Sequence, residues 1–411
     1  MKNLKLLVVA FVAMFGFIAC DKHECNDHDH SADLVGTWTC LTENYAEVLI
    51  INADGSAVSY GVEDGEYWEN VKGTVTVKEN NISMIFEDDD NWTGHFDIIP
   101  GQAFSLFENT GERYVYNYCA NDLSDEIVGM WVCADGPYDK ENDMVIQTFD
   151  ENGTVTKTGW SVASNKFIVQ DALTYKVVGD LLFHQRPSDM VTEGVAANFA
   201  SKLTYMPNAN QLGDMLTNTT NKVVNGKVVE LSMSMLRIKQ SLDLTGTTYD
   251  YSSAYVSNAK GKNEDFSMLG HTFNMSNIKG HNFDMMFRSE LFCIDLNANS
   301  ITQRFRANGR DIEIVIPITV DDNKVTLDLS AENPAYRKVD MYMFQDADNS
   351  QLHMYMHTND FINYFGNMEL YNLLAAGEID KTDAAAIEKV FVDMESRIES
   401  INVSFVFKAR K

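Results

Sequence analysis

A short sequence pattern occurs twice in this chain, and the repeat limits the folds that the chain can adopt. Residues 33–40 read DLVGTWTC and residues 126–133 read EIVGMWVC, so an acidic residue and a hydrophobic pair lead into Gly-x-Trp-x-Cys in each copy. A turn sequence follows each copy at a similar distance, around Gly55 in the first and Gly153 in the second. Similar segments in the same order indicate a duplicated structural unit. The sequence therefore predicts two domains of one fold in tandem.

Both copies consist of short strand-like runs. Between residues 33 and 121 such runs alternate with turn sequences, which is typical of an antiparallel barrel or sandwich. The second copy follows the same pattern through His184 and then departs from it, because the sequence from Ser188 has the apolar spacing of a helix. The sequence leaves open whether the second barrel is incomplete or takes strands from the residues that follow.

The Gly-x-Trp pattern at the first strand of such a meander resembles the lipocalin or calycin group, and particularly the lipocalin-like domains of bacterial lipoproteins. In that family the tryptophan plugs the closed end of the barrel, and an arginine on the last strand often covers it. The resemblance implies that Gly36 and Trp38 form this motif in the first barrel, and Gly129 and Trp131 in the second. The covering arginine has no obvious counterpart in the sequence. A tryptophan on a buried strand is more often core than ligand site.

The N-terminus has the features of an export signal. Lys2 and Lys5 precede an apolar run over residues 6–19, which is too short to span a bilayer as a permanent helix and ends directly before Cys20. This pattern resembles a bacterial lipoprotein signal with its lipobox. The resemblance implies cleavage before Cys20 and acylation of that residue, so that lipid anchors the protein. An ordinary secretion signal with an unrelated Cys20 is the alternative.

The stretch after Cys20 reads DKHECNDHDHSA, is polar and acidic, and is expected to act as a tether. By the lipoprotein resemblance, an acidic run at this place directs proteins of some bacterial phyla to the outer face of the outer membrane. In enteric bacteria an Asp at the next position, here Asp21, instead retains the protein inside. The whole stretch favours a lipid-anchored outer-membrane protein exposed on the cell surface, and the choice between the two faces stays open.

Length and composition indicate a further domain. Chains of more than roughly 250 to 300 residues tend to divide into domains, and this chain has 411 residues. All five tryptophans lie at or before Trp160, whereas 14 of the 20 methionines lie after residue 200, which favours a third domain of different composition. The formal net charge of -28 repels nucleic-acid backbones, so no nucleic-acid partner is expected.

Strand-like runs continue in the third domain, and helices are predicted over residues 360–376 and 383–399. The second helix is expected to lay one apolar face on the sheet, formed by Ile387, Phe391, Met394 and Ile398. The predicted fold class is mainly β, with two tandem small antiparallel lipocalin-like β-barrels followed by an α+β domain of antiparallel sheet with two C-terminal helices. The predicted boundaries are 1–19 for the signal peptide, 20–32 for the lipidated cysteine and acidic tether, 33–122 and 123–208 for the two barrels, and 209–411 for the C-terminal domain.

The sequence contains no motif of a known catalytic or metal site, neither a Walker loop nor a nucleophile elbow nor HExxH. The best candidate is His353-x-x-x-His357, which on a strand would place both histidines and Tyr355 on one face. A third metal ligand is missing there, so a polar sheet face is favoured. No catalytic residue, metal or cofactor is predicted.

Two functions remain after these exclusions. The first is a non-enzymatic, lipid-anchored cell-surface binding or accessory protein for a small apolar molecule or a glycan. The second is a structural scaffold or adhesin-like protein, whose barrels are spacers for a C-terminal interaction domain. A deep apolar pocket with a few convergent polar groups would favour binding, whereas a filled core would favour the scaffold. An eight-stranded barrel is just small enough for side chains to fill. The sequence specifies neither the ligand nor the oligomeric state.

Cys40 and Cys119 are the natural disulfide candidates of the first barrel, because closure brings its first and last strands together. Side-chain alternation argues against the bond. Cys40 shares a face with Trp38, whereas Cys119 lies on the face opposite the row Tyr114, Tyr116 and Tyr118. We therefore expect Cys40 and Cys119 to be unbridged thiols. The alternative is a disulfide between them, which would require a β-bulge that turns one of the two side chains to the other face.

Overall fold

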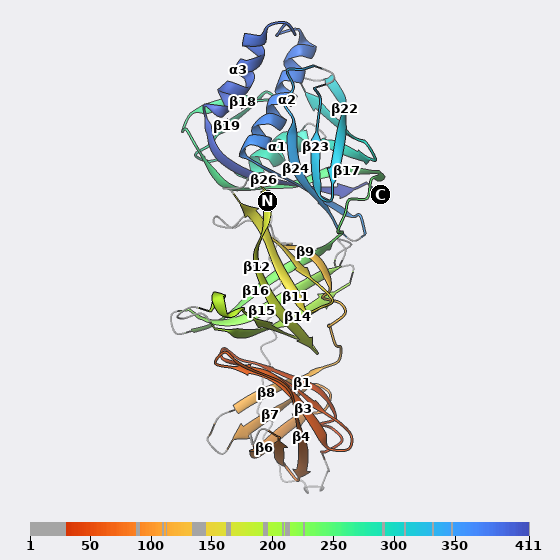
Figure 1. The fold of residues 1–411 in the computed structure, drawn as a ribbon, viewed down its shortest axis with the longest axis vertical. Helices are drawn as coiled ribbons and strands as arrows, with labels where there is room; N and C mark the ends of the chain where they lie inside the picture. The colour runs from red at the N-terminus through yellow and green to blue at the C-terminus, as the bar shows by residue number, and fades with distance from the viewer. Residues whose placement is uncertain are drawn as a thin grey trace, which may run out of the picture.

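The computed structural model contains three closed antiparallel β-barrels of eight strands each, stacked along the longest axis of the molecule (Figure 1). It describes residues 30–410 apart from residues 88–90, 109–110, 112, 134–144, 162–165, 192–195, 208, 210–213, 225–226, 290–291, 308–309, 331–332 and 347. Cys20, the predicted signal peptide and most of the predicted tether lie outside these residues. Within them, no helix is both long and apolar enough to cross a membrane. The prediction of a mainly β protein with lipocalin-like barrels is confirmed.

The first barrel is an up-and-down meander in which each strand pairs with the next and the last pairs with the first. Its strands are β1 (Gly36–Leu41), β2 (Tyr45–Ile51), β3 (Ser56–Glu63), β4 (Glu66–Lys78), β5 (Asn81–Phe86), β6 (Asn91–Ile99), β7 (Ala103–Glu108) and β8 (Arg113–Cys119). On β2, Tyr45 and Leu49 point into this barrel, whereas Ala46 and Val48 pack against the second one. Because both faces of β2 are covered, its sequence is apolar almost throughout.

The second barrel closes with strands that lie beyond the predicted boundary at residue 208. Its strands are β9 (Gly129–Cys133), β10 (Val145–Phe149), β11 (Thr154–Ser161), β12 (Lys166–Val178), β13 (Leu181–Gln185), β14 (Asn198–Met206), β15 (Met215–Val224) and β16 (Lys227–Ile238). Strand β16 pairs with β9, so this barrel takes its last two strands from the residues that follow. The helix expected from Ser188 is one 3-10 turn, η1 (Ser188–Met190).

The third domain is also a closed barrel, so the prediction of an α+β domain is wrong. Its barrel strands are β17 (Thr245–Gly261), β20 (Cys293–Asn297), β21 (Ser300–Ala307), β22 (Arg310–Asp321), β23 (Lys324–Leu327), β24 (Val339–Gln345), β25 (Gln351–His357) and β26 (Ile398–Ala409), and a separate hairpin consists of β18 (Asp265–Met268) and β19 (His271–Asn274). Strand β17 closes the barrel because it pairs with both β20 and β26. Its sequence is rich in Thr, Ser and Tyr and has few strongly apolar residues, so the apolar pattern did not reveal it.

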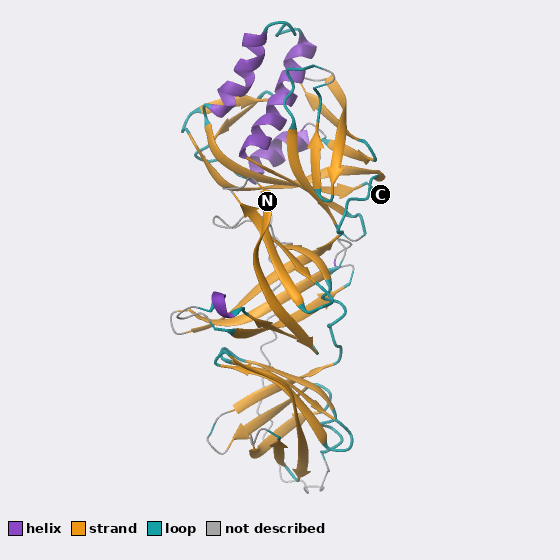
Figure 2. Cartoon of the chain, in the orientation of Figure 1, coloured by secondary structure: helices purple, strands orange, loops and turns teal. Residues whose placement is uncertain are grey.

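Three helices gather at the end of the third barrel: α1 (Gly280–Ser289), α2 (Thr358–Ala376) and α3 (Ala384–Glu395) (Figure 2). Ile387, Phe391 and Met394 of α3 are buried in the core of this domain, as predicted. Ile398, the fourth residue predicted on this helical face, is also buried, but it begins β26 because the helix ends at Glu395. Helix α3 packs closely on α2, since a Cβ at Gly366 would lie 2.5 Å from the Phe391 ring. Helix α2 ends at Gly377, whose φ of 72° favours glycine.

Apolar contacts join the three barrels. Between the first two, the rings of Tyr67 and Phe183 lie 5.8 Å apart, and Asn198 Nδ2 donates to the Gly65 carbonyl at 2.7 Å. Between the second and third, the Phe167 ring lies 4.7 Å from that of Tyr342 and contacts two further aromatic rings of the third barrel. The first and third barrels thus lie at opposite ends of one continuous stack (Figure 1).

The two repeat tryptophans occupy equivalent places. Trp38 and Trp131 are fully buried, and each Nε1 donates at 2.7 Å to the carbonyl of the residue four positions earlier, Leu34 and Ile127 respectively. Gly36 and Gly129, two residues before them, have φ values of 144° and 135°, which favour glycine.

The side chain that covers the tryptophan differs between the two barrels. In the second barrel it is Arg237 on the last strand, whose guanidinium lies 4.6 Å from the Trp131 ring and donates to the Val128 carbonyl at 2.8 Å. In the first barrel Tyr118 takes the corresponding place, 5.2 Å from the Trp38 ring. The arginine that the lipocalin resemblance implies is therefore present in one barrel. Sequence reasoning missed it because it lies beyond the predicted boundary of that barrel.

Cys40 and Cys119 lie on opposite faces of the first barrel, as the side-chain alternation predicted. Cys40 belongs to the inner core, whereas Cys119 is packed outside against Gly179 of the second barrel, and neither forms a disulfide. Burial and the Glu47 carboxylate raise the pKa of Cys40 to about 12. Burial, followed by Asp180, raises the pKa of Cys119 to about 11.

Both thiols are expected to resist alkylation in the folded protein. A pKa raised from 9.0 to about 12 lowers the thiolate fraction at pH 8 by about a thousandfold, and the thiolate is the reactive form. Mass spectrometry after iodoacetamide treatment should find Cys40 and Cys119 unmodified in the native protein and modified in urea. Recovery of a crosslinked Cys40–Cys119 peptide without reduction would contradict the assignment of the two faces.

Candidate functional site

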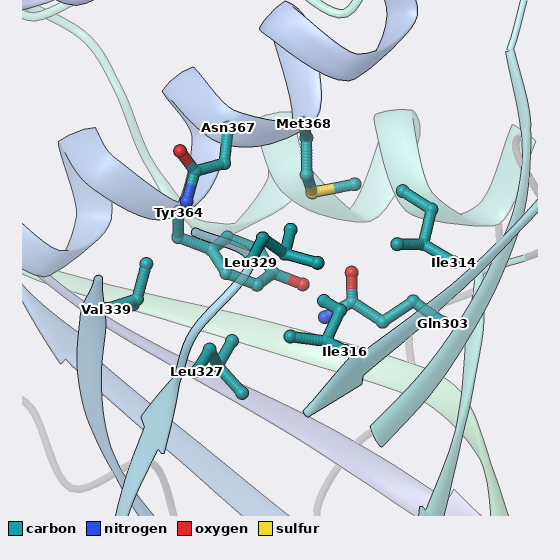
Figure 3. Close-up of a pocket in the computed structure, with 9 residues that line it drawn as sticks. All are labelled: Gln303, Ile314, Ile316, Leu327, Leu329, Val339, Tyr364, Asn367 and Met368. Carbon is teal, nitrogen blue, oxygen red and sulfur yellow. The ribbon is translucent and has the colours of Figure 1, made fainter. Parts of the chain in front are cut away.

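The interior of the third barrel is almost filled by side chains. Its cavity is lined mainly by apolar residues from the barrel wall and by α2, and Figure 3 shows the Tyr364 hydroxyl and the Gln303 amide pointing toward each other across it. The space open to the centre of a water-sized sphere is only about 20 Å³. A cavity needs roughly 10 to 15 Å³ by this measure to hold one water molecule. The cavity therefore suits a water molecule rather than a larger ligand.

The second barrel has a buried histidine inside it. His184 lies on the same face of β13 as the core residue Leu182, and its ring stacks on Phe199 with centroids 4.6 Å apart. Burial, followed by the charge of Arg186, lowers the pKa of His184 to about 3. The imidazole is therefore neutral at physiological pH and acts as a packed ring.

The first barrel contains a buried carboxylate. Glu47 points inward from β2 and is 7% exposed. Its Oε2 accepts hydrogen bonds from the hydroxyls of Tyr45, at 2.5 Å, and Tyr116, while its Oε1 accepts one from the Ser59 hydroxyl at 2.5 Å. No ion pair joins Glu47 to a basic side chain of the described residues. A buried carboxylate is thus held by neutral hydroxyl donors alone.

The strands position this cluster through alternation and one bulge. Tyr45 and Glu47 are two residues apart on β2, so both point inward. The pairing of β3 with β4 shifts between Ser59 and Gly61, which brings Trp68 of β4 over the barrel interior. Trp68 Nε1 donates to Ser59 Oγ at 2.8 Å, and a Cβ at Gly61 would lie 2.0 Å from the Trp68 ring. Gly61 is therefore required for the indole to lie where it does.

A pocket of about 470 Å³ reaches this cluster from the open end of the first barrel, opposite the end that Trp38 closes. It includes four carboxylates and three aromatic rings, and no Lys, Arg or His stands among its lining residues: Tyr45, Glu47, Ser59, Glu63, Asp64, Glu66, Trp68, Val71 and Phe86. Small-molecule sites usually have volumes of roughly 300 to 1,000 Å³ and a few placed polar groups. The pocket has the size of such a site, and its lining is more acidic than is usual.

Burial and the neighbouring Glu47 carboxylate keep the hydroxyls of Tyr45 and Tyr116 protonated. Burial raises the pKa of Tyr45 and of Tyr116 well above the usual tyrosine value, and the Glu47 carboxylate raises both further. The two phenols therefore remain hydrogen-bond donors to Glu47 across the physiological range.

His353 and His357, the candidate metal ligands of the sequence, lie away from this pocket. His353, Tyr355 and His357 lie on one face of β25, opposite the core residues Met354 and Met356, as predicted. Burial lowers the pKa of His353 to about 4, and His357 Nε2 lies 3.0 Å from Asp360 Oδ2. Among the described residues, no group of three or more His, Cys, Asp or Glu side chains could hold a metal ion.

Sequence reasoning missed Glu47, although the signal was present. The residue is the one charge within the apolar strand YAEVLII and has the same parity as Tyr45 and Leu49. A charge in a strand that is covered on both faces is unfavourable unless it is paired or has a role. That rule would have identified Glu47, but the strand had to be known to be buried on both faces.

Comparisons with known proteins show no family. No family model and no curated protein matches the chain. Two solved structures align with 89% of it: a double mutant of transferrin-binding protein B from Haemophilus parasuis Hp5, at 9% identity and a TM-score of 0.25, and the isotype 1 transferrin-binding protein B from serogroup B Neisseria meningitidis, at 9% identity and a TM-score of 0.21. The alignments cover 66% of each of those chains, slightly less than two thirds. At such low TM-scores, these similarities carry no information about ligand or partner.

Proposed function

We propose that this chain is a non-enzymatic, lipid-anchored binding protein of the bacterial outer-membrane surface, in which the first barrel holds a small ligand at its open end. The observation that carries the proposal is the pocket of about 470 Å³ that reaches the buried Glu47. By the same measure, the cavity inside the third barrel has a volume of only about 20 Å³. The lipid anchor at Cys20 rests on the lipobox resemblance.

The lining favours a polar ligand over the small apolar molecule that the sequence suggested. Four carboxylates would lose hydration against an apolar ligand without gaining hydrogen bonds, which is unfavourable. A ligand with hydroxyl or amine donors would satisfy them, and a flat ring or chain could lie on Trp68 and Tyr45. A glycan or a small amine fits this chemistry.

The scaffold hypothesis keeps support from the rest of the molecule. The third barrel is nearly filled, and all three barrels are joined by continuous apolar contacts. In that function the first two barrels would hold the third away from the membrane, since the first and third lie at opposite ends of the stack (Figure 1). The two functions differ in whether the first barrel binds a small molecule.

Titration calorimetry of the full mature protein in detergent, with a panel of neutral monosaccharides and small amines, tests the proposal. We expect at least one saturable ligand, and we expect Trp68→Ala to weaken it at least about tenfold, because the indole forms one wall of the pocket. Ile85→Ala is the matched control, since Ile85 is 55% exposed on β5 and does not line the pocket. If no panel member binds, or if Trp68→Ala binds as the native protein does, the scaffold function is favoured instead.

A further inference from the structure

We propose that the ligand of the first barrel is a small organic cation, with its ammonium group beside Glu47 and the rings of Tyr45 and Trp68. This inference rests on the proposed binding function of the same pocket and names its ligand class. Three features carry it. The first is the buried carboxylate of Glu47, which has no cationic partner among the described residues; the second is an acidic rim formed by Glu63, Asp64 and Glu66; the third is the pair of aromatic rings beside Glu47.

The first step concerns the charge of Glu47. A buried carboxylate is unfavourable unless it is paired with a positive charge or fully hydrogen-bonded. An ionised carboxylate has about four acceptor positions, and the hydroxyls of Tyr45, Tyr116 and Ser59 occupy three of them. The remaining position and the net charge have no partner among the described residues. A cation in the pocket would supply both.

The second step concerns the residues above Glu47. Glu63, Asp64 and Glu66 line the same pocket near its opening, on the hairpin that joins β3 to β4. A cleft lined by one sign of charge raises the local concentration of ligands with the opposite sign. No Lys, Arg or His is among the residues that line the pocket, so the lining itself is of one sign of charge.

The third step concerns the aromatic rings. The centroids of Tyr45 and Trp68 lie 6.1 Å apart, with an angle of 41° between the rings. Both rings are held in place, Tyr45 by its hydrogen bond to Glu47 and Trp68 by its bond to Ser59. A cation within about 6 Å of an aromatic face is attracted to it, and tryptophan is the best such partner. Rings and carboxylate at one place favour an ammonium group over a neutral sugar.

The second barrel provides an internal comparison. Trp38 pairs with Leu49 and Trp131 pairs with Gln147, so the residue two positions earlier is Glu47 in the first barrel and Val145 in the second. The repeat unit thus folds without a carboxylate at this place. The carboxylate of Glu47 is therefore a feature of the first barrel and not of the repeat unit.

Calorimetric titration of the full mature protein with choline, spermidine and glucose tests the ligand class. We expect the two cations to bind, glucose not to bind, and a rise from 50 to 500 mM NaCl to weaken the cations because salt screens the rim. Glu47→Gln keeps the shape of the side chain and should weaken cation binding at least about tenfold. The matched control is Asp97→Asn, because Asp97 is exposed on β6 outside the pocket.

Glu66→Gln at the rim serves as a second variant if Glu47→Gln fails to fold, and it should weaken the binding of spermidine more than that of choline. Binding of glucose with loss in Trp68→Ala, and no binding of either cation, would overturn the cation inference and leave the proposed binding function standing. Absence of binding by every compound would overturn both. Unchanged cation affinity in a folded Glu47→Gln variant would overturn the role of that carboxylate.

Discussion

Replacing Cys20 with alanine is expected to move the protein from the membrane fraction to the soluble fraction of bacteria that export and acylate it. Each buried methylene of an acyl chain contributes about 0.8 kcal/mol to membrane attachment, and stable anchoring takes more than one chain. No described helix could span a bilayer, and a formal net charge of -28 disfavours binding to anionic lipid.

The measurement is fractionation after an alkaline carbonate wash, together with metabolic labelling by palmitate. Cys25→Ala is the matched control, because Cys25 lies in the same acidic stretch and is not preceded by the lipobox pattern. That variant should remain labelled and membrane-bound. Two outcomes would contradict the lipobox assignment. One is a native protein that takes up no palmitate, and the other is a Cys20→Ala variant that is still labelled with palmitate.

Trp131→Ala is expected to destabilise the second barrel by about 3 to 5 kcal/mol, the usual range for removing a buried tryptophan. The indole is fully buried, and its loss leaves a cavity beside core residues such as Leu182 and Leu203. Arg237 would also lose the ring on which its guanidinium lies. Trp38→Ala should have an effect of the same size in the first barrel.

The measurement is hydrogen exchange in increasing urea, followed on peptides from β9 and β16, because the barrels need not unfold together. Trp131→Phe is the control that keeps a ring beneath Arg237 and loses the hydrogen bond to the Ile127 carbonyl, so a smaller loss is expected. If Trp131→Ala left the hydrogen exchange of β9 and β16 unchanged, the tryptophan would not be what holds the barrel closed.

Features that depend on nearby residues could be read from the sequence. The repeat identified the two tryptophans with their glycines, which the structure places in equivalent buried positions. Alternation along β8 placed Cys119 outside the barrel, and helical spacing identified α2 and the buried face of α3. In each case the periodicity of one element determines which side chains face the core.

Barrel closure was decided by the tertiary structure. Strand β17 pairs with β26 through partners such as Tyr249 and Ala409, about 160 residues apart, and no local pattern specifies such a pair. Strand β16 closes the second barrel in the same way and brings Arg237 over Trp131.

The candidate site also depends on the folded barrel. The sequence by itself determined that the chain has a repeated barrel unit with a tryptophan for each of the first two barrels, and it predicted a lipid anchor at Cys20. Only the folded barrel brings Glu47 of β2, Ser59 of β3 and Tyr116 of β8 to one point. The physical reason is that a strand's alternation fixes only which face a side chain takes, whereas strand pairing and barrel closure fix its neighbours.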